Sequence, residues 1–357
     1  MVETACVIGG GIHGMMTAIA LQAAGFKVII LEKNKNILEG TSGATHNRAH
    51  MGYHYPRSIE TAKECIDGLN YFNEKYPSAL YFPKDVYYII EKNSKTSVAE
   101  YKQFCNNMNI PYIEELPLEY IKPGLIESGF KVSEPIFDIN ILRKNLNKQI
   151  KENNIRLKTS TELVSFKPYL GGYKLICTKH NKIQSYYANI IVNATYAYAN
   201  NILSILDLEE DMSEYRLQHT EVAIVKSKKY LPSITVMDGP HVSLMPYANR
   251  KNLYLLYDVV NSVREEKIGF FFKDKAFKSN IQNMLDHCSL YFNFDLKYID
   301  SLYGSRPIPT KISDDARTTR IIKHKKYKSV YSILEGKFIS APLIAEALVS
   351  LIKEEKA

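Results

Sequence analysis

The chain has 357 residues, of which 45% are hydrophobic and 24% charged, so it can fold as two domains or one large one around a sizeable core. No apolar run reaches spanning length, and the five cysteines, in no CxxC spacing, argue against a disulfide framework and a metal site. The net charge of +8 is spread along the chain, which favours a small anionic substrate or a loose membrane contact over nucleic acid.

The N-terminal segment predicts a nucleotide-binding unit. A short buried strand, TACVI at 4–8, precedes the turn GGGIHG, a helix that stops at Gly25, and the strand KVIILEK. Glycines at 9, 11 and 14 in this context match the dinucleotide fingerprint, in which they permit a tight turn, backbone approach to a pyrophosphate, and close helix–strand packing. No basic region precedes this apolar segment, and a histidine interrupts it, so we expect no signal peptide and a cytoplasmic protein, with peripheral contact at the inner membrane surface as an alternative.

The second strand ends at an acidic residue, Glu32, which can accept hydrogen bonds from a ribose hydroxyl and would repel the extra phosphate of NADP. The fingerprint by itself leaves NAD and FAD open. The predicted dinucleotide contacts in this unit are Gly9, Gly11, Ile12, His13, Gly14, Glu32 and Lys33.

A polar, aromatic loop follows where an NAD enzyme would normally continue with alternating strands and helices. It reads GTSGATHNRAHMGYHYPRS, residues 40–58, and contains three histidines, two arginines and three glycines. A helix is predicted next, at 59–77, with apolar residues at helical spacing and Pro77 at its end. The loop therefore favours FAD over NAD.

Six blocks of the chain, in this order, resemble the D-amino-acid-oxidase-like superfamily of FAD-dependent oxidoreductases, which includes glycine and sarcosine oxidases, L-2-hydroxyglutarate oxidase and FAD-dependent glycerol-3-phosphate dehydrogenase. In its flavin-facing loop the chain is most similar to the last two. Two blocks depart from the family pattern: Tyr196 replaces a glycine, and the C-terminal loop has Gly336 alone. The blocks are CVIGGGIHGMMTAIALQAAGFKVIILEK, SG with HMGYHY, EPIFDINILRKNLNKQIKENNIRLKTSTELVSF, ANIIVNATYAYAN, SLYGSRPIPT and EGKFISAPLIAEALVSLIKEE.

The resemblance implies an α/β fold with a discontinuous Rossmann-like FAD-binding domain at 1–80, 135–215 and 300–357. An inserted, mostly antiparallel β substrate domain would occupy 81–134 and 216–299, and its sheet would face the flavin. The residues agree, because 81–120 and 216–260 contain alternating strand-like runs broken at turns, such as LYFPKDVYYIIE and NLYLLYDVV.

The resemblance also implies further FAD contacts. Lys337 and the helix that begins near Ser340 would place positive potential beside the flavin; a surface lysine is the alternative. The contacts implied outside the first unit are Thr41, Ser42, Gly52, Val164, Ala194, Thr195, Gly336, Lys337, Phe338, Ile339 and Ser340.

Two residues are the main candidates for catalysis and substrate binding. Imidazole suits proton acceptance near neutral pH, and His50 aligns with the family histidine. Arg306, in the family's Gly-x-Arg-Pro position, would bind a carboxylate or phosphate; an ion pair with Asp314 or Asp315 is the alternative. A covalent histidyl–flavin bond is an open alternative.

Other loop residues have weaker assignments. Tyr53, His54 and Tyr55 would face the substrate, with packing of the loop as the alternative for the tyrosines. We expect His46 to be a satisfied polar group. Arg48 and Arg57 would face an acidic substrate only if they are not solvated.

The leading functional prediction is an FAD enzyme that oxidises a CH–OH carbon of a small acidic metabolite, with an electron acceptor that the sequence leaves unknown. The alternatives are oxidation of a CH–NH carbon, a non-catalytic module that keeps the dinucleotide fold, and a nicotinamide-dependent dehydrogenase, which the block order disfavours.

Overall fold

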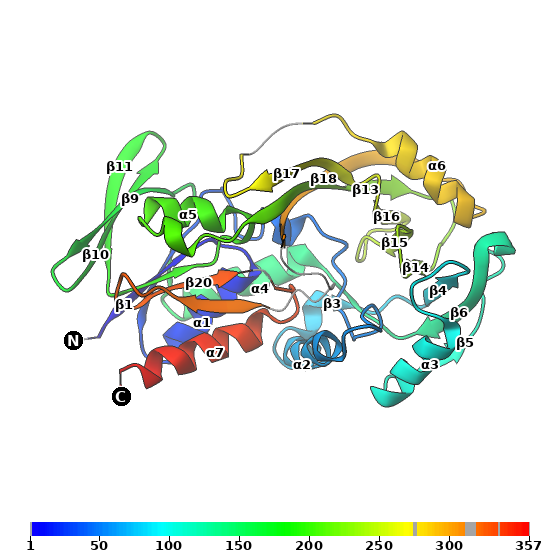
Figure 1. Ribbon diagram of the computed structural model, residues 1–357, viewed down its shortest axis with the longest axis horizontal. Helices are drawn as coiled ribbons and strands as arrows, with labels where there is room; N and C mark the ends of the chain where they lie inside the picture. Colours follow the sequence, from blue (N-terminus) through cyan, green and yellow to red (C-terminus); the bar gives the residue numbers. More distant parts are fainter. Residues whose placement is uncertain (1, 274–276, 311–318, 335, 357) are drawn as a thin grey trace.

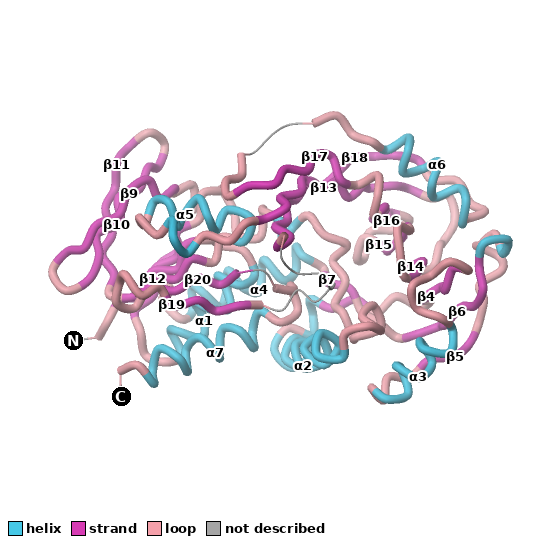
Figure 2. Tube along the Cα trace, viewed as in Figure 1, coloured by secondary structure: helices cyan, strands magenta, loops and turns pink. Residues whose placement is uncertain are grey.

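The computed structural model describes residues 2–273, 277–310, 319–334 and 336–356, and its chain forms two units around two large sheets (Figures 1 and 2). The first unit holds a six-stranded sheet in the order β19-β20-β12-β1-β2-β8, parallel except for β19. Its strands are β1 (Thr4–Ile8), β2 (Lys27–Leu31), β8 (Arg156–Lys158), β12 (Ile190–Asn193), β19 (Arg320–Lys323) and β20 (Val330–Leu334).

Successive side chains of β1 face opposite sides of this sheet, so both faces are covered. Ala5 and Val7 join a core formed with helices α1, α2, α4 and α7, whereas Cys6 and Ile8 join a core formed with α5 and a three-stranded antiparallel sheet. These elements are α1 (Ile12–Ala23), α2 (Ile59–Lys75), α4 (Ile139–Glu152), α5 (Ala199–Ile205), α7 (Ala341–Glu354), β9 (Glu162–Tyr169), β10 (Gly172–Lys179) and β11 (Lys182–Ala188).

The second unit is built on a nine-stranded, mostly antiparallel sheet in the order β17-β13-β16-β15-β14-β4-β6-β5, with β18 also paired to β13. Helix α6 packs on one face, and α3 covers the β4–β6 end of the other. The elements are β4 (Val86–Glu91), α3 (Val98–Asn107), β5 (Tyr112–Glu114), β6 (Ile126–Val132), β13 (Tyr215–Lys226), β14 (Ser233–Met237), β15 (Val242–Pro246), β16 (Leu253–Asp258), β17 (Val263–Gly269), α6 (Ile281–Tyr291) and β18 (Lys297–Pro309).

Short elements connect the units. A two-stranded sheet joins β3 (Leu80–Tyr81) to β7 (Ile136–Phe137), and 3-10 turns lie at Thr41–Gly43, Pro77–Ala79, Pro123–Leu125, Tyr196–Tyr198 and Glu209–Asp211. The helix predicted at 59–77 is α2, and its N-cap is Ser58, whose side chain accepts a hydrogen bond from the Thr61 amide.

The structure differs from the predicted layout at one boundary. The segments expected to be mostly β form strands of the second sheet and also contain helices α3 and α6. The boundary expected at residue 300 falls inside β18, which pairs with β13 from Lys297 to Pro309 and so belongs to the second sheet.

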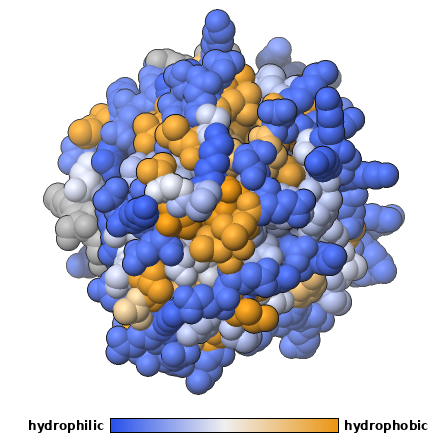
Figure 3. Space-filling model, turned by 90° about the vertical axis from the view of Figure 1, so that its right-hand side faces the viewer, coloured by the Kyte–Doolittle hydropathy of each residue, from blue (hydrophilic) through white to orange (hydrophobic). Residues whose placement is uncertain are grey.

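Figure 3 views the molecule from the end where α3, β5 and β6 lie and shows a group of apolar residues among hydrophilic ones. Large exposed apolar side chains of this unit include Ile113 of β5 and Leu290 of α6. Among the described residues, no helix is both long and apolar enough to cross a bilayer. The cytoplasmic location stays a prediction.

Candidate active site

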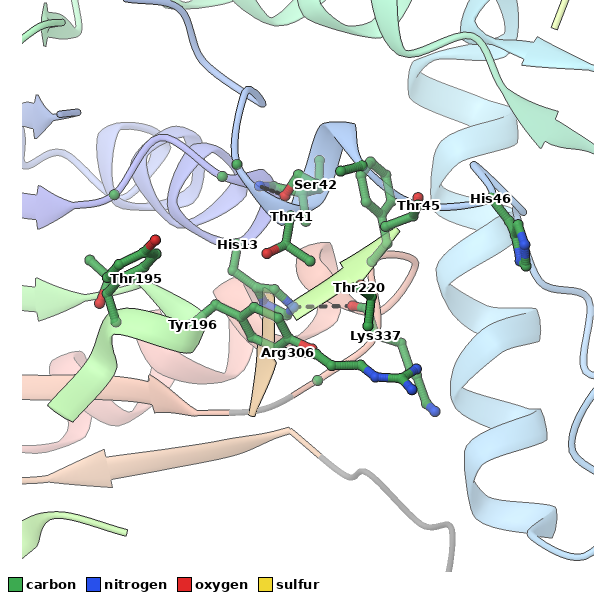
Figure 4. A pocket seen from close by; sticks show the side chains of 18 of the residues that line it. His13, Thr41, Ser42, Thr45, His46, Thr195, Tyr196, Thr220, Arg306 and Lys337 are labelled. Carbon is green, nitrogen blue, oxygen red and sulfur yellow. Dashed lines mark hydrogen bonds between the residues drawn. The ribbon is translucent and has the colours of Figure 1, made fainter. Parts of the chain in front are cut away.

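A cavity of about 1140 Å³ is lined by residues of both units. It runs from the glycine turn before α1, along the 40–58 loop, to the inner face of the second sheet at Thr220, Thr235 and Tyr257. Ligand pockets commonly measure about 300–1,000 Å³, so this cavity has room for a dinucleotide and a small substrate. Figure 4 shows part of its lining.

The glycine turn at the start of α1 has the shape that its sequence predicts. Gly9 has φ +107°, and a Cβ on it would lie 2.7 Å from the Ala194 carbonyl oxygen. A Cβ on Gly14 would lie 1.9 Å from the Gly9 carbonyl oxygen, so only glycine permits this helix–strand contact. The turn therefore leaves open backbone at the N-terminus of α1, where the helix dipole favours an anion.

Glu32 lines the cavity at the end of β2. Its carboxylate accepts hydrogen bonds from the Gly10 amide (2.6 Å) and the Asn34 amide (2.7 Å). Burial raises the pKa of Glu32, while these two amides oppose the shift. The buried carboxylate is held beside the turn with oxygen lone pairs that can accept further hydrogen bonds.

Two hydroxyls of the 40–58 loop attach it to both units. Ser42 Oγ accepts a hydrogen bond from the Ile12 amide at 3.1 Å, in the first turn of α1. Thr41 donates to the Ser305 carbonyl oxygen of β18 at 2.7 Å. Both residues line the cavity, so the loop forms its wall between the turn and the second sheet.

Tyr196 lines the cavity after β12 in a left-handed conformation, φ +56°. The turn thus keeps a backbone that suits the family's glycine although a tyrosine stands there. Asn193 holds the neighbouring residue by accepting hydrogen bonds from both the amide and the hydroxyl of Thr195. Ala194 and Thr195 also line the cavity.

The C-terminal loop meets the glycine turn through His13. The His13 Nε2 lies 3.1 Å from the Lys337 carbonyl oxygen, and burial lowers the pKa of His13 to about 4. Gly336, with φ +100°, makes the bend before it. Lys337 Nζ lies 4.3 Å from the centroid of the Tyr55 ring, a cation–π contact, and Phe338 also lines the cavity.

His50 lies on the cavity wall with a tyrosine on one side and a carboxylate on the other. Its Nε2 is 3.2 Å from the Tyr55 hydroxyl, and its Nδ1 is 3.9 Å from Glu134 Oε1. Burial, then the positive charge of Arg48, holds the pKa of His50 well below 6.5, with Lys337 adding to the effect. The imidazole is therefore neutral at pH 7 and can accept a proton.

Arg48 is buried rather than solvated, and it lines the cavity. Its guanidinium donates to the Tyr88 hydroxyl (3.0 Å) and to Thr235 Oγ1 (2.5 Å), and its Nε is 3.5 Å from Glu134 Oε2. Nη1 lies 3.1 Å from His54 Nδ1. Because a guanidinium only donates, His54 Nδ1 must accept, and the neutral ring carries its proton on Nε2.

Arg57 is also paired with protein. Its Nε donates to Asp238 Oδ2 at 2.6 Å, which joins the loop to the end of β14 at the cavity wall.

Arg306 reaches the cavity from β18. Its Nε donates to Gln218 Oε1 at 2.7 Å, and its guanidinium carbon lies 5.7 Å from the centre of the Tyr257 ring. In Figure 4 the side chains of Arg306 and Lys337 extend in the same direction, away from Thr195. The proposed partners Asp314 and Asp315 lie outside the described residues.

Six residues expected to face cofactor or substrate lie outside the cavity lining. Tyr53 is fully buried: its hydroxyl donates to the Pro111 carbonyl oxygen, and its ring packs in the core beneath α3. Val164 points outward because strand β9 alternates, and Leu163 lines the cavity instead. The others serve packing or turns: Gly14 against Gly9, Gly52 at φ +96° against Ala62, Ile339 against Gly68, and Ser340 at the N-terminus of α7.

The remaining predicted residues do line the cavity; they are Gly9, Gly11, Ile12, His13, Glu32, Lys33, Thr41, Ser42, His50, His54, Tyr55, Ala194, Thr195, Arg306, Gly336, Lys337 and Phe338. Sequence reasoning missed Glu134 behind His50, and Thr220, Thr235 and Tyr257 in the wall. The only signal in the sequence for Thr220, Thr235 and Tyr257 is that each occupies an inward-facing position of its strand, β13, β14 or β16. Glu134, next to Pro135, has no pattern of its own.

The sequence matches a family model described as FAD dependent oxidoreductase over residues 4–351. The chain belongs to this family. Glycerol 3-phosphate oxidase of Mycoplasma pneumoniae is 23% identical to this chain, and the match covers 97% of this chain and 93% of that protein. L-2-hydroxyglutarate dehydrogenase of Indibacter alkaliphilus is 24% identical over 50% of this chain and 36% of that protein. An FAD-dependent monooxygenase of Fusarium mangiferae is 32% identical, but the match spans only 31% of this chain and 30% of the relative.

Solved structures share the fold. The L-α-glycerophosphate oxidase of Mycoplasma pneumoniae with FAD bound has a TM-score of 0.73 and 19% identity, over 98% of this chain and 93% of that one. Glycine oxidase of Geobacillus kaustophilus has a TM-score of 0.73 and 15% identity, over 99% and 95% of the two chains. The Rossmann-like fold and the cofactor FAD, both predicted from sequence, are confirmed.

The residues present fit FAD. The open backbone before α1, the Ser42 hydroxyl and the Glu32 carboxylate line one arm of a cavity large enough for the cofactor and continuous with His50. A buried His13 Nδ1 without a partner in the described part of the chain points to a missing ligand there. The turn and α1 N-terminus would hold the pyrophosphate, and Glu32 a ribose.

Proposed function

We propose that this FAD-dependent oxidoreductase oxidises the CH–OH carbon of a small anionic metabolite to a carbonyl. The observation that carries the proposal is His50, a buried imidazole on the cavity wall whose pKa is held well below 6.5. An alcohol must lose its hydroxyl proton on oxidation, whereas a free amine needs no base, so a neutral imidazole favours the alcohol.

FAD, when bound, supplies the redox chemistry by accepting the hydride that leaves the substrate carbon. His50 Nε2 takes the hydroxyl proton, so the substrate hydroxyl replaces the Tyr55 hydroxyl, which lies 3.2 Å from that nitrogen in the absence of substrate. Glu134 lies 3.9 Å from Nδ1, where its negative charge stabilises the imidazolium that forms. The bond electrons of C–H leave with the hydride and those of O–H form the C=O double bond.

Arg306 supplies the charge that binds an anionic substrate. Gln218 holds its Nε, which aims a planar guanidinium at the cavity wall beside Tyr257. A guanidinium binds carboxylate or phosphate through parallel hydrogen bonds. Two of the relatives are named for such hydroxy anions, glycerol 3-phosphate and L-2-hydroxyglutarate, which supports the same substrate class here.

The test is anaerobic bleaching of the FAD absorption by matched pairs that differ only in the reacting group: lactate against alanine, and 2-hydroxyglutarate against glutamate, with glycerol 3-phosphate added. We expect hydroxy anions to bleach the flavin and their amine partners not to. His50→Asn should slow bleaching at least about 100-fold with FAD content unchanged. The control is His180→Asn, in an exposed turn at φ +48°, which should change neither the bleaching rate nor the FAD content. Bleaching by the amines alone, or an unimpaired His50→Asn, would contradict the proposal.

A further inference from the structure

Several polar atoms of the cavity-lining residues are buried without a hydrogen-bond partner in the part of the chain that the structure describes, and two of them belong to rings in contact with each other. These two are His46 Nε2 and the Tyr257 hydroxyl. This corrects the expectation that His46 is a satisfied polar group. A buried unsatisfied group costs about 1–3 kcal/mol, so native proteins rarely leave two together without a ligand or water to satisfy them.

The two groups form one surface with an arginine. The His46 and Tyr257 rings meet edge to face with centroids 4.8 Å apart, and the Arg306 guanidinium lies 5.7 Å from the Tyr257 ring. His46 comes from the 40–58 loop, Tyr257 from β16 and Arg306 from β18. Three separate segments therefore converge on one part of the cavity wall.

The chemistry of this surface selects its ligand. Burial, then the charges of Arg48 and Arg306, lowers the pKa of His46 well below 6.5, so the ring is neutral and has one donor and one acceptor nitrogen. A phenol hydroxyl also donates and accepts. The ligand group that matches both is a hydroxyl, whereas an ammonium group would be repelled by the two arginines.

We propose that His46, Tyr257 and Arg306 form a subsite for a polyhydroxylated anion: Arg306 binds the anionic group, and the His46–Tyr257 pair exchanges hydrogen bonds with a hydroxyl. This rests on the proposed function, in which His50 engages the hydroxyl that is oxidised, so the hydroxyl at His46 is a second one. The substrate class becomes a sugar acid or a polyol phosphate rather than a simple 2-hydroxy acid.

The test uses probes with and without the second hydroxyl. Glycerate is paired with lactate for the carboxylate arm, and glycerol 3-phosphate with 1,2-propanediol 1-phosphate for the phosphate arm. Anaerobic titration of the FAD-loaded enzyme, followed by the perturbation of the flavin spectrum in stopped flow, gives a dissociation constant whether or not reduction follows.

We expect His46→Phe and Tyr257→Phe to weaken binding of the hydroxylated probes about fivefold or more, the value of one hydrogen bond, and to change the deoxy probes less than about twofold. Tyr101→Phe is the matched control, because it also removes a buried phenol hydroxyl, but one that lies in the α3 core and not in the cavity wall. It should leave every dissociation constant unchanged.

The outcomes separate the two proposals. Equal effects on hydroxylated and deoxy probes, no effect at all, or no binding of any hydroxylated probe to the unaltered enzyme would overturn the subsite, and the wall would then hold an ordered water only. If the enzyme binds the hydroxylated probes selectively but its flavin is never reduced by them, the proposed function is overturned and the subsite stands.

Discussion

Tyr196 shows how one residue can keep a conformation that its side chain disfavours. A non-glycine residue in the left-handed region pays roughly 1–2 kcal/mol, and such strain persists where surrounding contacts hold it. Tyr196 has φ +56° on the cavity wall, where the family pattern has glycine. The strain is therefore tolerated at a residue that lines the cavity.

Two substitutions at this position isolate the backbone term. Tyr196→Gly and Tyr196→Ala both remove the ring, but only glycine relieves the left-handed backbone. We expect the glycine variant to be more stable than the alanine variant by about 1 kcal/mol, although alanine is usually the more stabilising of the two. Chemical denaturation of both apoproteins measures the difference; an alanine variant of equal or greater stability would refute the argument.

The charges around His50 predict the pH dependence of the reaction. Because the pKa of His50 lies well below 6.5, kcat/KM should stay level as the pH falls through 6.5 and decline only at more acidic pH. Lys337 contributes to this shift, so Lys337→Gln should move the acidic limb to higher pH. Profiles of both proteins against one hydroxy anion test this; a limb that moves the other way contradicts it.

At the scale of elements, helix α2 positions the C-terminal loop that carries Lys337. A Cβ on Gly68 of α2 would lie 2.2 Å from the Ile339 carbonyl oxygen, so the helix and the loop touch through backbone. The loop in turn holds His13 through the Lys337 carbonyl. The packing of α2 is thus linked to the glycine turn by two contacts, Gly68 with Ile339 and the Lys337 carbonyl with His13.

Gly68→Ala tests this path. The added methyl must push the loop away from α2, and overpacking of this kind costs about 1–3 kcal/mol. We expect a lower midpoint of thermal unfolding and weaker FAD binding in fluorescence titration. Gly124→Ala, whose Cβ would meet nothing within 4 Å, is the control and should match the unaltered protein in both measurements.

At the scale of the whole molecule, several histidines line the cavity between the two sheets and are neutral in the folded protein. The pKa of His13 falls to about 4 on burial, and those of His46 and His50 fall well below 6.5. The unfolded chain, with ordinary histidines, binds protons first as the pH drops, so acid favours unfolding from about pH 6.5 downwards.

The stability of the apoprotein should therefore decrease between pH 6.5 and 5. His13 alone accounts for a loss on the order of 2 kcal/mol, at about 1.36 kcal/mol per unit. Urea unfolding at each pH measures it, and His13→Gln, which keeps a donor for the Lys337 carbonyl, should flatten the dependence. A stability that rises over this range would show that these histidines are protonated in the folded protein.

The sequence by itself determined the strand–turn–helix fold of the first unit and much of the cavity lining around its glycine turn. Local rules suffice there: glycines at 9 and 11 must form a tight turn before a helix, and Glu32 must end the next strand, because chain neighbours place them. The 40–58 loop was recognisable by composition. The sequence suggested roles for its histidines, but it could not show which groups from distant segments surround each ring.

Only the tertiary structure decided those surroundings. It placed Glu134, a residue 84 positions away along the chain, behind His50; it turned Tyr53 into the α3 core; and it brought Tyr257 against His46. Loop conformation and the pairing of β13, β16 and β18 set these contacts. They are long-range, so their energies depend on packing that no local pattern encodes.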